Sequence, residues 1–353
     1  MPDLDPDELV GRCTAAAARA WPGTVVTGLR RLEGGVSSLT YASTLVSSDG
    51  EQPIVVKVAP PGLAPVRNRD VLRQARVLRV LTGLDGFPVP RVLFDDPGDP
   101  PGVPPLFAME LLPGDSYEAL LDVSPTPPSA AVAAERMLVA ARALARLHAE
   151  TPESLGVVDE PVTSVADELS RWERLFATVD PDIGPGHEQL AARLSERLPT
   201  AGAPRLLHGD YRVANMLFTG ARLEAVIDWE IWSVGDPRSD LAWLLMHAAP
   251  AQVFHEQRPP ADVEAGRLMP TAAELLAGYV AARRAAGTPE GALESSVAEL
   301  SWFLAVCHYK TAATIAVIHK RDRKSSRPTP RIAVAAAHLG DVLDAGHRVL
   351  DER

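Results

Sequence analysis

The chain has 353 residues, of which 46% are hydrophobic and 23% are charged, and its formal net charge is −11. This composition is that of an ordinary globular protein, which excludes global disorder. The acidic balance argues against a nucleic-acid-binding protein, which would normally show a basic surface. Because the length exceeds that of a usual single core, we expect two lobes or two domains.

Two features bear on the compartment. Only Cys13 and Cys307 are present, too few for a disulfide framework, which indicates a reducing environment. The first residues, MPDLDPDELV, lack the basic start and apolar run of a signal peptide. No uninterrupted apolar stretch reaches the ~20 residues that span a bilayer. We therefore expect a cytoplasmic protein without a membrane span, whose oligomeric state the sequence leaves open.

The first hundred residues are predicted to form a small antiparallel sheet with one helix. Alternating apolar and β-branched residues, separated by Gly, Ser and Asp turn signals, are typical of strands. Between Val71 and Leu81 the apolar residues recur at helical spacing. The expected strands are 24–32, 39–47, 53–59, 91–96 and 105–112.

After Asp115 the pattern becomes helical, interrupted by short apolar runs that are separated by turns. The expected helices are 130–150, 164–179, 188–198, 238–247, 271–286, 294–320 and 332–350. The sequence thus predicts an α+β fold, with an N-terminal sheet lobe at 1–112 and a larger, mainly helical lobe at 113–353.

The stretch LLHGDYRVANMLFTG, residues 206–220, carries the strongest chemical signal and is followed by VIDWE at 226–230. Phosphoryl transfer to a hydroxyl needs a carboxylate to accept the proton, and ligands for the Mg²⁺ that neutralises the triphosphate. A hairpin of NMLF and LEAVI would bring Asp228 beside Asn215, and an amide with a carboxylate suits Mg²⁺. The spacing predicts Asp210 as base and Asn215 and Asp228 as metal ligands. HGD alone would more simply be a turn, with Asn215 as a cap.

HGDYRVAN at 208–215 resembles the catalytic loop of the aminoglycoside phosphotransferase family, which has choline-kinase-like and protein-kinase-like relatives. VIDWE resembles the metal-binding segment of that family, and SDLAW at 239–243 the segment that follows. The resemblance implies a protein-kinase-like two-lobed fold with ATP and Mg²⁺ as cofactors. The N-terminal lobe would bind nucleotide, and the C-terminal lobe would hold the catalytic and substrate-binding residues. It also implies that Asp240 braces the catalytic loop and that His208 supports it.

The same resemblance assigns the small lobe. GGVSS (Gly34, Gly35, Val36, Ser37 and Ser38) would cover the phosphates, although by itself it is more typical of a hairpin turn. Lys57 would bind the phosphates, the alternative being a solvated edge residue. MELL would form the hinge that binds adenine through Met109, Glu110 and Leu111, or simply an inner strand.

One residue departs from the family pattern. Where a glutamate usually pairs with the strand-three lysine, this chain has Gln74, in RQARVL. An amide carbonyl can accept a hydrogen bond from an ammonium but supplies no opposing charge. Asp70, one turn back on the same helix, is an alternative partner for Lys57.

The predicted partner is a small-molecule substrate with a hydroxyl, whose identity stays open. An aminoglycoside would suit an acidic pocket, to which Glu230, Asp262, Glu264 and Glu274 are candidate contributors. Helices around Trp243 and Trp302 could instead line an apolar pocket for a macrolide or a hydroxyacyl chain, and a choline-like acceptor is a further alternative. The basic segment 319–331 is either a solvated loop or a contact for an anionic substrate. The rival function is a catalytically weak nucleotide-binding protein with a regulatory or scaffolding role.

Overall fold

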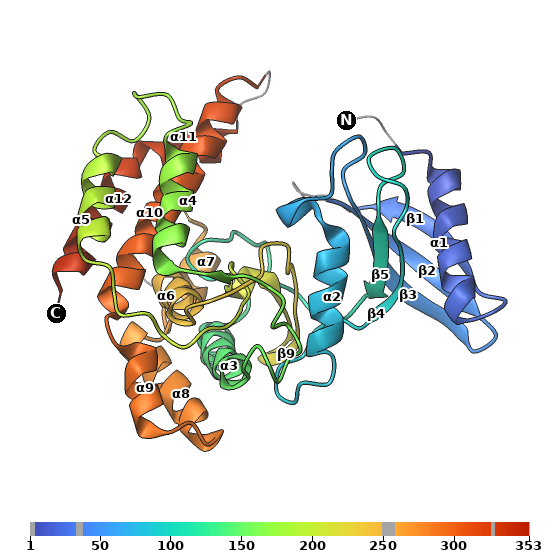
Figure 1. The fold of residues 1–353 in the computed structure, drawn as a ribbon, viewed down its shortest axis with the longest axis horizontal. Coiled ribbons are helices and arrows are strands. Elements are labelled where there is room, and N and C mark those ends of the chain that lie inside the picture. The colour runs from blue at the N-terminus through green and yellow to red at the C-terminus, as the bar shows by residue number, and fades with distance from the viewer. Residues whose placement is uncertain (1–3, 33–37, 249–257, 326–328, 353) are drawn as a thin grey trace. The chain divides into compact units, whose positions relative to one another are not determined.

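The computed structural model describes residues 4–32, 38–248, 258–325 and 329–352 (Figure 1). The chain divides into two compact units. The first holds residues 1–115 together with 215–219 and 223–232, and the second holds 116–214, 220–222 and 233–353. The predicted division at 112/113 assigned both inserted segments to the C-terminal lobe. They group with the first unit because their hairpin bonds to it through the backbone, as in the 2.8 Å bond from Val226 N to Pro88 O.

The first unit contains the predicted antiparallel sheet, whose strand order is β1-β2-β3-β5-β4. Its strands are β1 (Val25–Arg31), β2 (Leu39–Ser47), β3 (Gly50–Val58), β4 (Val92–Asp96) and β5 (Leu106–Glu110). Lys57 lies on β3, which is hydrogen-bonded on both sides, opposite Thr40 on β2 and Phe107 on β5. The alternative of a solvated edge lysine is therefore wrong, and the Lys57 side chain is only 12% exposed.

Two helices, α1 (Pro6–Ala20) and α2 (Val71–Leu81), lie on opposite sides of this sheet (Figure 1). The sequence predicts α2 but not α1. The signal for α1 was present, since the Asp5 side chain caps it, Pro6 is its first residue and acidic residues follow in the first turn. Apolar residues of α1, including Leu9 and Cys13, are buried with the sheet in one core.

The second unit is mainly helical, as predicted. Its helices are α3 (Ala130–Ala149), α4 (Val165–Phe176), α5 (His187–Glu196), α6 (Arg238–His247), α7 (Pro260–Ala265), α8 (Ala272–Ala285), α9 (Glu290–Val297), α10 (Leu300–Asp322), α11 (Pro330–Ala337) and α12 (Leu339–Asp351). Two predicted helices are each divided. Glu299, at φ 55°, separates α9 from α10, and His338 separates α11 from α12. The short helix α7 was not predicted.

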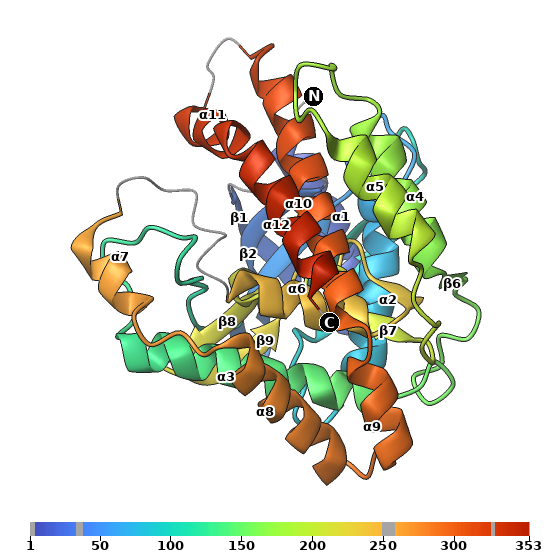
Figure 2. The ribbon, with the colours of Figure 1, turned by 90° about the vertical axis from the view of Figure 1, so that its left-hand side faces the viewer.

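Helix α10 is central to the second unit, where it packs against α4, α6 and α12 (Figure 2). Its buried residues share a core with all three. Trp302 belongs to this core, and its indole N–H donates to Leu194 O at 3.0 Å. Among the described residues, one stretch, Glu290–Asp322, is long and apolar enough to cross a membrane, but 61% of its most apolar window is buried within the protein.

Two small sheets position the motif residues. The strands β8 (Met216–Thr219) and β9 (Arg222–Val226) form the predicted hairpin. The strands β6 (Val162–Thr163), β10 (Ser233–Gly235) and β7 (Arg205–Leu207) form the other sheet, and β7 leads directly into His208. Gly114 lies against β8 at φ +119°, where a Cβ would be 2.9 Å from Phe218 O, so a side chain there would displace the hairpin.

Candidate active site

The loop that follows β7 is held by a buried carboxylate on α6. Asp240 is 1% exposed, and its two carboxylate oxygens accept hydrogen bonds from His208 N at 2.6 Å and Gly209 N at 2.9 Å. Burial raises the pKa of Asp240, while these N–H groups favour the ionised form. Gly209 has φ 85°, in the left-handed region that favours glycine. Asp240 thus accepts hydrogen bonds from two successive backbone N–H groups of this loop.

Two further side chains anchor the loop from within. His208 is fully buried, and its Nδ1 accepts a 3.2 Å hydrogen bond from Asp210 N. Tyr211 is also fully buried, and its hydroxyl donates to Ala140 O on α3 at 2.9 Å. These contacts fix the backbone on either side of Asp210.

The side chain of Asp210 has a partner that the sequence did not indicate. The indole Nε1 of Trp243 donates to Asp210 Oδ1 at 2.7 Å. Trp243 follows Asp240 by three residues on α6, so both side chains lie on one face of the helix. The carboxylate predicted to act as base is therefore held in a defined orientation.

Lys310 on α10 completes this arrangement. Its Nζ donates to Gly209 O at 2.6 Å and lies 3.8 Å from the centroid of the Trp243 ring. At that distance an ammonium is attracted to the indole face, so the same lysine holds both the loop and the tryptophan. From the sequence, Trp243 is expected only to line a pocket, and Lys310 carries no prediction. The spacing of three residues between Asp240 and Trp243 was the one signal that could have linked Trp243 to the catalytic loop.

A second polar cluster contacts the loop through Arg212. Its guanidinium lies 3.0 Å from the carboxylate of Glu118, which is 1% exposed, and 3.3 Å from Nε2 of His247. Burial raises the pKa of Glu118 to about 8, against the opposite effect of Arg212. Burial and Arg212 together lower the pKa of His247 to about 3, so His247 is neutral near pH 7.

The first unit brings together three residues that lie far apart in the sequence. Lys57 Nζ donates to Gln74 Oε1 at 3.1 Å and to Asp228 Oδ1 at 2.9 Å. Gln74 therefore occupies the position of the usual glutamate, and its buried Nε2 has no hydrogen-bond partner among the residues that the structure describes. Asp70 instead caps α2, accepting from Arg73 N at 3.0 Å. The hypothesis that Asp70 pairs with Lys57 is not supported.

The hairpin brings the two predicted metal ligands together through the backbone. Asn215 directly precedes β8, and its carbonyl accepts a 2.9 Å hydrogen bond from Ile227 N, next to Asp228. Asp228 has φ 63°, an uncommon conformation for a residue other than glycine, and its side chain is 42% exposed. The carboxylate is thus held beside Lys57 while staying accessible. Among the described residues no group of three or more His, Cys, Asp or Glu side chains could hold a metal ion by itself.

The structure describes only some of the other residues predicted to bind nucleotide in the small lobe. Gly34, Gly35, Val36 and Ser37 lie outside the described residues, whereas Ser38 is described and is 4% exposed. At the predicted hinge, Glu110 N bonds to Arg91 O and Leu111 N bonds to Pro53 O. These two N–H groups are therefore engaged within the sheet. Met109 is buried at 9% exposure, as an inner-strand residue would be.

The charged residues considered for the acceptor have other partners. Asp262 is fully buried and accepts from the Tyr117 hydroxyl at 2.7 Å. Glu264 pairs with Arg267, and Glu274 forms a capping box with Thr271. Each of these three carboxylates thus has a polar partner in the second unit.

The basic segment is engaged in a similar way. Lys320 lies 3.3 Å from Asp180, and Arg323 pairs with Asp182 at 2.8 Å. Arg331 donates to Leu121 O at 3.0 Å. The described part of this segment is therefore tied to neighbouring loops of its own unit.

Comparison with known structures defines the class of fold. A Ralstonia eutropha protein assigned as an aminoglycoside phosphotransferase has a TM-score of 0.70 with this chain, at 21% identity over 92% of each chain. A type I macrolide 2'-phosphotransferase has a TM-score of 0.56, at 23% identity over 96% of this chain and 99% of that one. The fold is thus the kinase-like α+β fold of these phosphotransferases, as the sequence predicts.

The family follows from the sequence comparison. A model of the phosphotransferase enzyme family matches residues 28–259, about two thirds of the chain. The protein belongs to this family, and it is a kinase-like enzyme by family.

Two curated relatives differ in their names and in the share of this chain that they match. Acyl-CoA dehydrogenase family member 11 of Pongo abelii is 28% identical over 289 residues, which are 79% of this chain and 35% of that protein. The viomycin phosphotransferase of Streptomyces vinaceus is 26% identical over 181 residues, 48% of this chain and 60% of that protein. The chain thus spans about a third of the length of the acyl-CoA dehydrogenase family relative.

Proposed function

We propose that the protein transfers the γ-phosphate of ATP to a hydroxyl group of a small molecule. The observation that carries this proposal is the presentation of Asp210, whose loop is braced by Asp240 and whose carboxylate is oriented by Trp243. A general base must be held within reach of the proton that it accepts, and the second carboxylate oxygen would serve that purpose. Asp210 would orient the acceptor hydroxyl and accept its proton.

Residues of the first unit would bind the nucleotide. Lys57 would contact the phosphates, and Gln74 would hold its ammonium in place. Mg²⁺ would neutralise charge on the triphosphate, with Asp228 and Asn215 as protein ligands. This donor set fits the ion, because Mg²⁺ takes one or two carboxylates or amide oxygens and completes its shell with water and phosphate. The predicted loop 34–38 and the segment at Met109–Leu111 would cover the phosphates and the adenine.

For the acceptor we favour a hydroxyacyl compound over an aminoglycoside. Three of the four carboxylates considered for a polycationic drug already have polar partners within the second unit. In addition, 79% of the chain matches a protein named as a member of an acyl-CoA dehydrogenase family. A hydroxyl on an acyl chain would be a natural substrate for a phosphotransferase that is part of such a protein.

A second candidate function has one observation in its favour. Gln74 replaces a carboxylate beside Lys57, which leaves Asp228 as the one charged partner of that ammonium among the described residues. A protein with this change could bind nucleotide for a regulatory or scaffolding role with little catalysis.

Substitution of the base separates the two candidates. We expect wild-type protein with Mg²⁺ and ATP to phosphorylate at least one member of a panel of hydroxyacyl thioesters, aminoglycosides, macrolides and choline. Asp210→Asn should reduce turnover by ~10² or more while Mg-ATP still binds. Binding of ATP by both proteins without turnover on any acceptor would favour the regulatory role. Near-normal turnover of Asp210→Asn would remove this residue from the role of base.

A further inference from the structure

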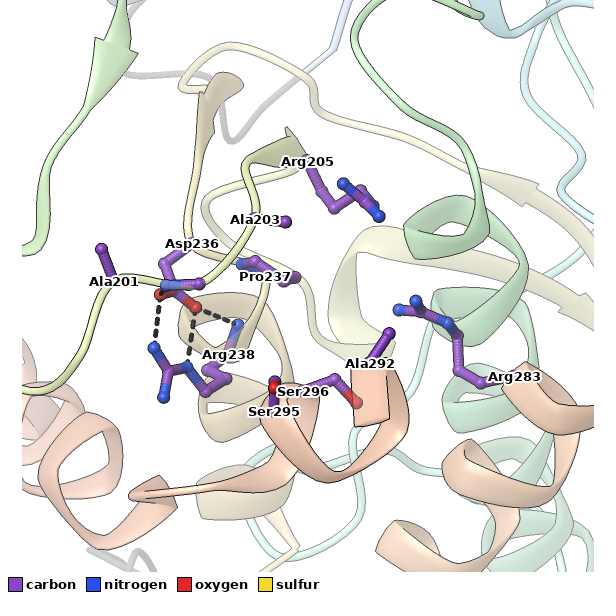
Figure 3. Close-up of a pocket in the computed structure, with 11 residues that line it drawn as sticks. Ala201, Ala203, Arg205, Asp236, Pro237, Arg238, Arg283, Ala292, Ser295 and Ser296 are labelled. Atoms are coloured by element: carbon purple, nitrogen blue, oxygen red, sulfur yellow. Dashed lines mark hydrogen bonds and ion pairs between the residues drawn. The ribbon is translucent and has the colours of Figure 1, made fainter. Parts of the chain in front are cut away.

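A separate cavity lies in the second unit, lined by residues from the start of β7, the N-terminal end of α6, and helices α8 and α9 (Figure 3). Its volume is about 210 Å³. None of the residues assigned to phosphoryl transfer lines it. It is therefore a candidate for a function of its own.

The lining carries an excess of positive charge. Its charged residues are three arginines, Arg205, Arg238 and Arg283, and one aspartate, Asp236. The carboxylate of Asp236 is engaged by the Arg238 guanidinium, with contacts of 2.9 Å and 2.7 Å that Figure 3 shows as dashed lines, and it also accepts from Gly202 N at 2.8 Å. Across the part of the chain that the structure describes, neither Arg205 nor Arg283 forms an ion pair with a carboxylate. Within the described residues, these two guanidiniums are thus not neutralised by a direct ion pair, in a protein whose net charge is −11.

Neutral groups hold both guanidiniums in fixed positions. Arg283, which is 3% exposed, donates to the Tyr279 hydroxyl at 3.0 Å and to Thr288 Oγ1 at 3.2 Å. Arg205 donates to His148 O at 2.9 Å and to Pro204 O at 2.8 Å. In both arginines, Nε and Nη1 thus donate hydrogen bonds. Within the described residues, Nη2 of each arginine has no hydrogen-bond partner. Both head groups lie on the same side of the cavity (Figure 3).

The surroundings of these two side chains compensate their charge only in part. Burial, followed by the nearby charge of Arg283, lowers the pKa of Arg205, while Tyr279 and Glu153 have a smaller, opposite effect. Burial and both arginines also lower the pKa of His148, which is fully buried beside them, well below its usual value. A buried charge without a direct counter-charge is costly. An anion bound between the two head groups would reduce this cost.

We propose that this cavity binds the phosphoryl group of a small phosphorylated ligand or inorganic phosphate, through Arg205 and Arg283. A phosphate group carries a charge of roughly −1.5 to −2 at pH 7, which matches two guanidiniums, and their planar forks suit its oxygens. The hydroxyls of Ser295 and Ser296 donate to backbone carbonyls, so the arginines would supply the N–H donors. The cavity is smaller than the roughly 300–1,000 Å³ of sites for drug-sized ligands, so it suits a phosphoryl group rather than a whole nucleotide.

The test is binding of inorganic phosphate, measured by calorimetry and by thermal shift at constant ionic strength without Mg²⁺ or nucleotide. We expect phosphate to raise the Tm of the wild-type protein more than chloride does. Arg205→Gln and Arg283→Met should each weaken phosphate binding about tenfold or more, since each removes a charged donor. Arg284→Met is the matched control, because Arg284 is the next residue on α8, is exposed and pairs with Glu290. It should bind phosphate as the wild type does.

The outcomes are decisive even if Arg283→Met fails to fold, because Arg205 is only partly buried and Arg205→Gln leaves α8 unchanged. Wild-type phosphate affinity in folded Arg205→Gln would overturn the assignment, as would the absence of any phosphate effect beyond that of chloride. A parallel titration with glycerol 2-phosphate distinguishes the two possible ligands, a phosphate ester and inorganic phosphate. Tighter binding of the ester than of inorganic phosphate would indicate a phosphorylated metabolite, and the reverse would indicate the free ion. Since no nucleotide is present, failure here would leave the proposed phosphoryl transfer untouched.

Discussion

The indole of Trp243 donates a 2.7 Å hydrogen bond to the carboxylate of Asp210, and the ammonium of Lys310 lies over the face of the same indole, 3.8 Å from its centroid. A buried aromatic residue thereby connects α10 to the proposed base. This relationship makes Trp243 a positioning residue, since it would act through Asp210 rather than on the substrate.

Trp243→Phe removes the indole N–H while keeping an aromatic ring. A hydrogen bond to a charged group contributes about 1.5–3 kcal/mol, so we expect kcat to fall roughly tenfold or more, with little change in KM for ATP. Steady-state kinetics with a validated acceptor would measure both parameters. Trp302→Phe is the control, because Trp302 donates to a core carbonyl, Leu194 O. Equal kcat values for the two variants would show that the Trp243 bond has no role in turnover.

Asp228→Ala removes the carboxylate that we assign to Mg²⁺. We expect ATP binding to lose most of its enhancement by Mg²⁺, measured by titration calorimetry with and without the ion. Asp95→Ala is a suitable comparison, because Asp95 is another carboxylate of the first unit and is paired with Arg79. If Mg²⁺ enhances ATP binding equally in Asp228→Ala and the wild type, Asp228 is not a ligand.

Gln74→Glu restores the charge that the family usually places beside the strand-three lysine. It also removes the buried Nε2 donor, for which the described part of the chain provides no partner. A charge-assisted hydrogen bond is about twice as strong as a neutral one, so we expect a few-fold lower KM for ATP or higher kcat. Asp70→Asn should leave ATP kinetics unchanged, because Asp70 caps α2 and asparagine is an equally good cap. Unchanged kinetics in an active Gln74→Glu preparation would refute the role of this contact in nucleotide positioning.

The buried carboxyl of Glu118 predicts a dependence of stability on pH. Its pKa is raised from 4.5 to about 8, so between these values the native state keeps a proton that the unfolded chain has lost. Rising pH therefore lowers the free energy of unfolding across this interval. We expect Glu118→Gln to show a shallower decline between pH 5 and pH 8 in urea denaturation. Glu135→Gln, at an exposed residue paired with Arg142, should keep the wild-type slope. Identical slopes for all three proteins would show that Glu118 ionises normally.

The sequence by itself determined the elements and the local motifs. Strand alternation and helical periodicity are properties of neighbouring residues, so the five strands and most helices could be predicted. Loop 208–210 and the hairpin between Asn215 and Asp228 could also be predicted, because turn signals and short sequence spacings determine them. The break at Glu299 lies inside the expected helix 294–320, which contains no Gly or Pro, so no local signal marks it. The break at His338 is followed two residues later by Gly340, a weak local signal that the helical periodicity outweighed.

Only the tertiary structure decided which distant side chains meet. Trp243 lies 33 residues from Asp210, Lys310 lies 101 residues from Gly209, and Asp228 lies 171 residues from Lys57. Whether Gln74 or Asp70 bonds to Lys57 depended on which side of α2 faces β3. The cavity lined by arginines depended on the packing of α8 and α9 near β7. Such contacts arise from the packing of whole elements, and a spacing in one sequence carries no information about the residue that another element brings to it.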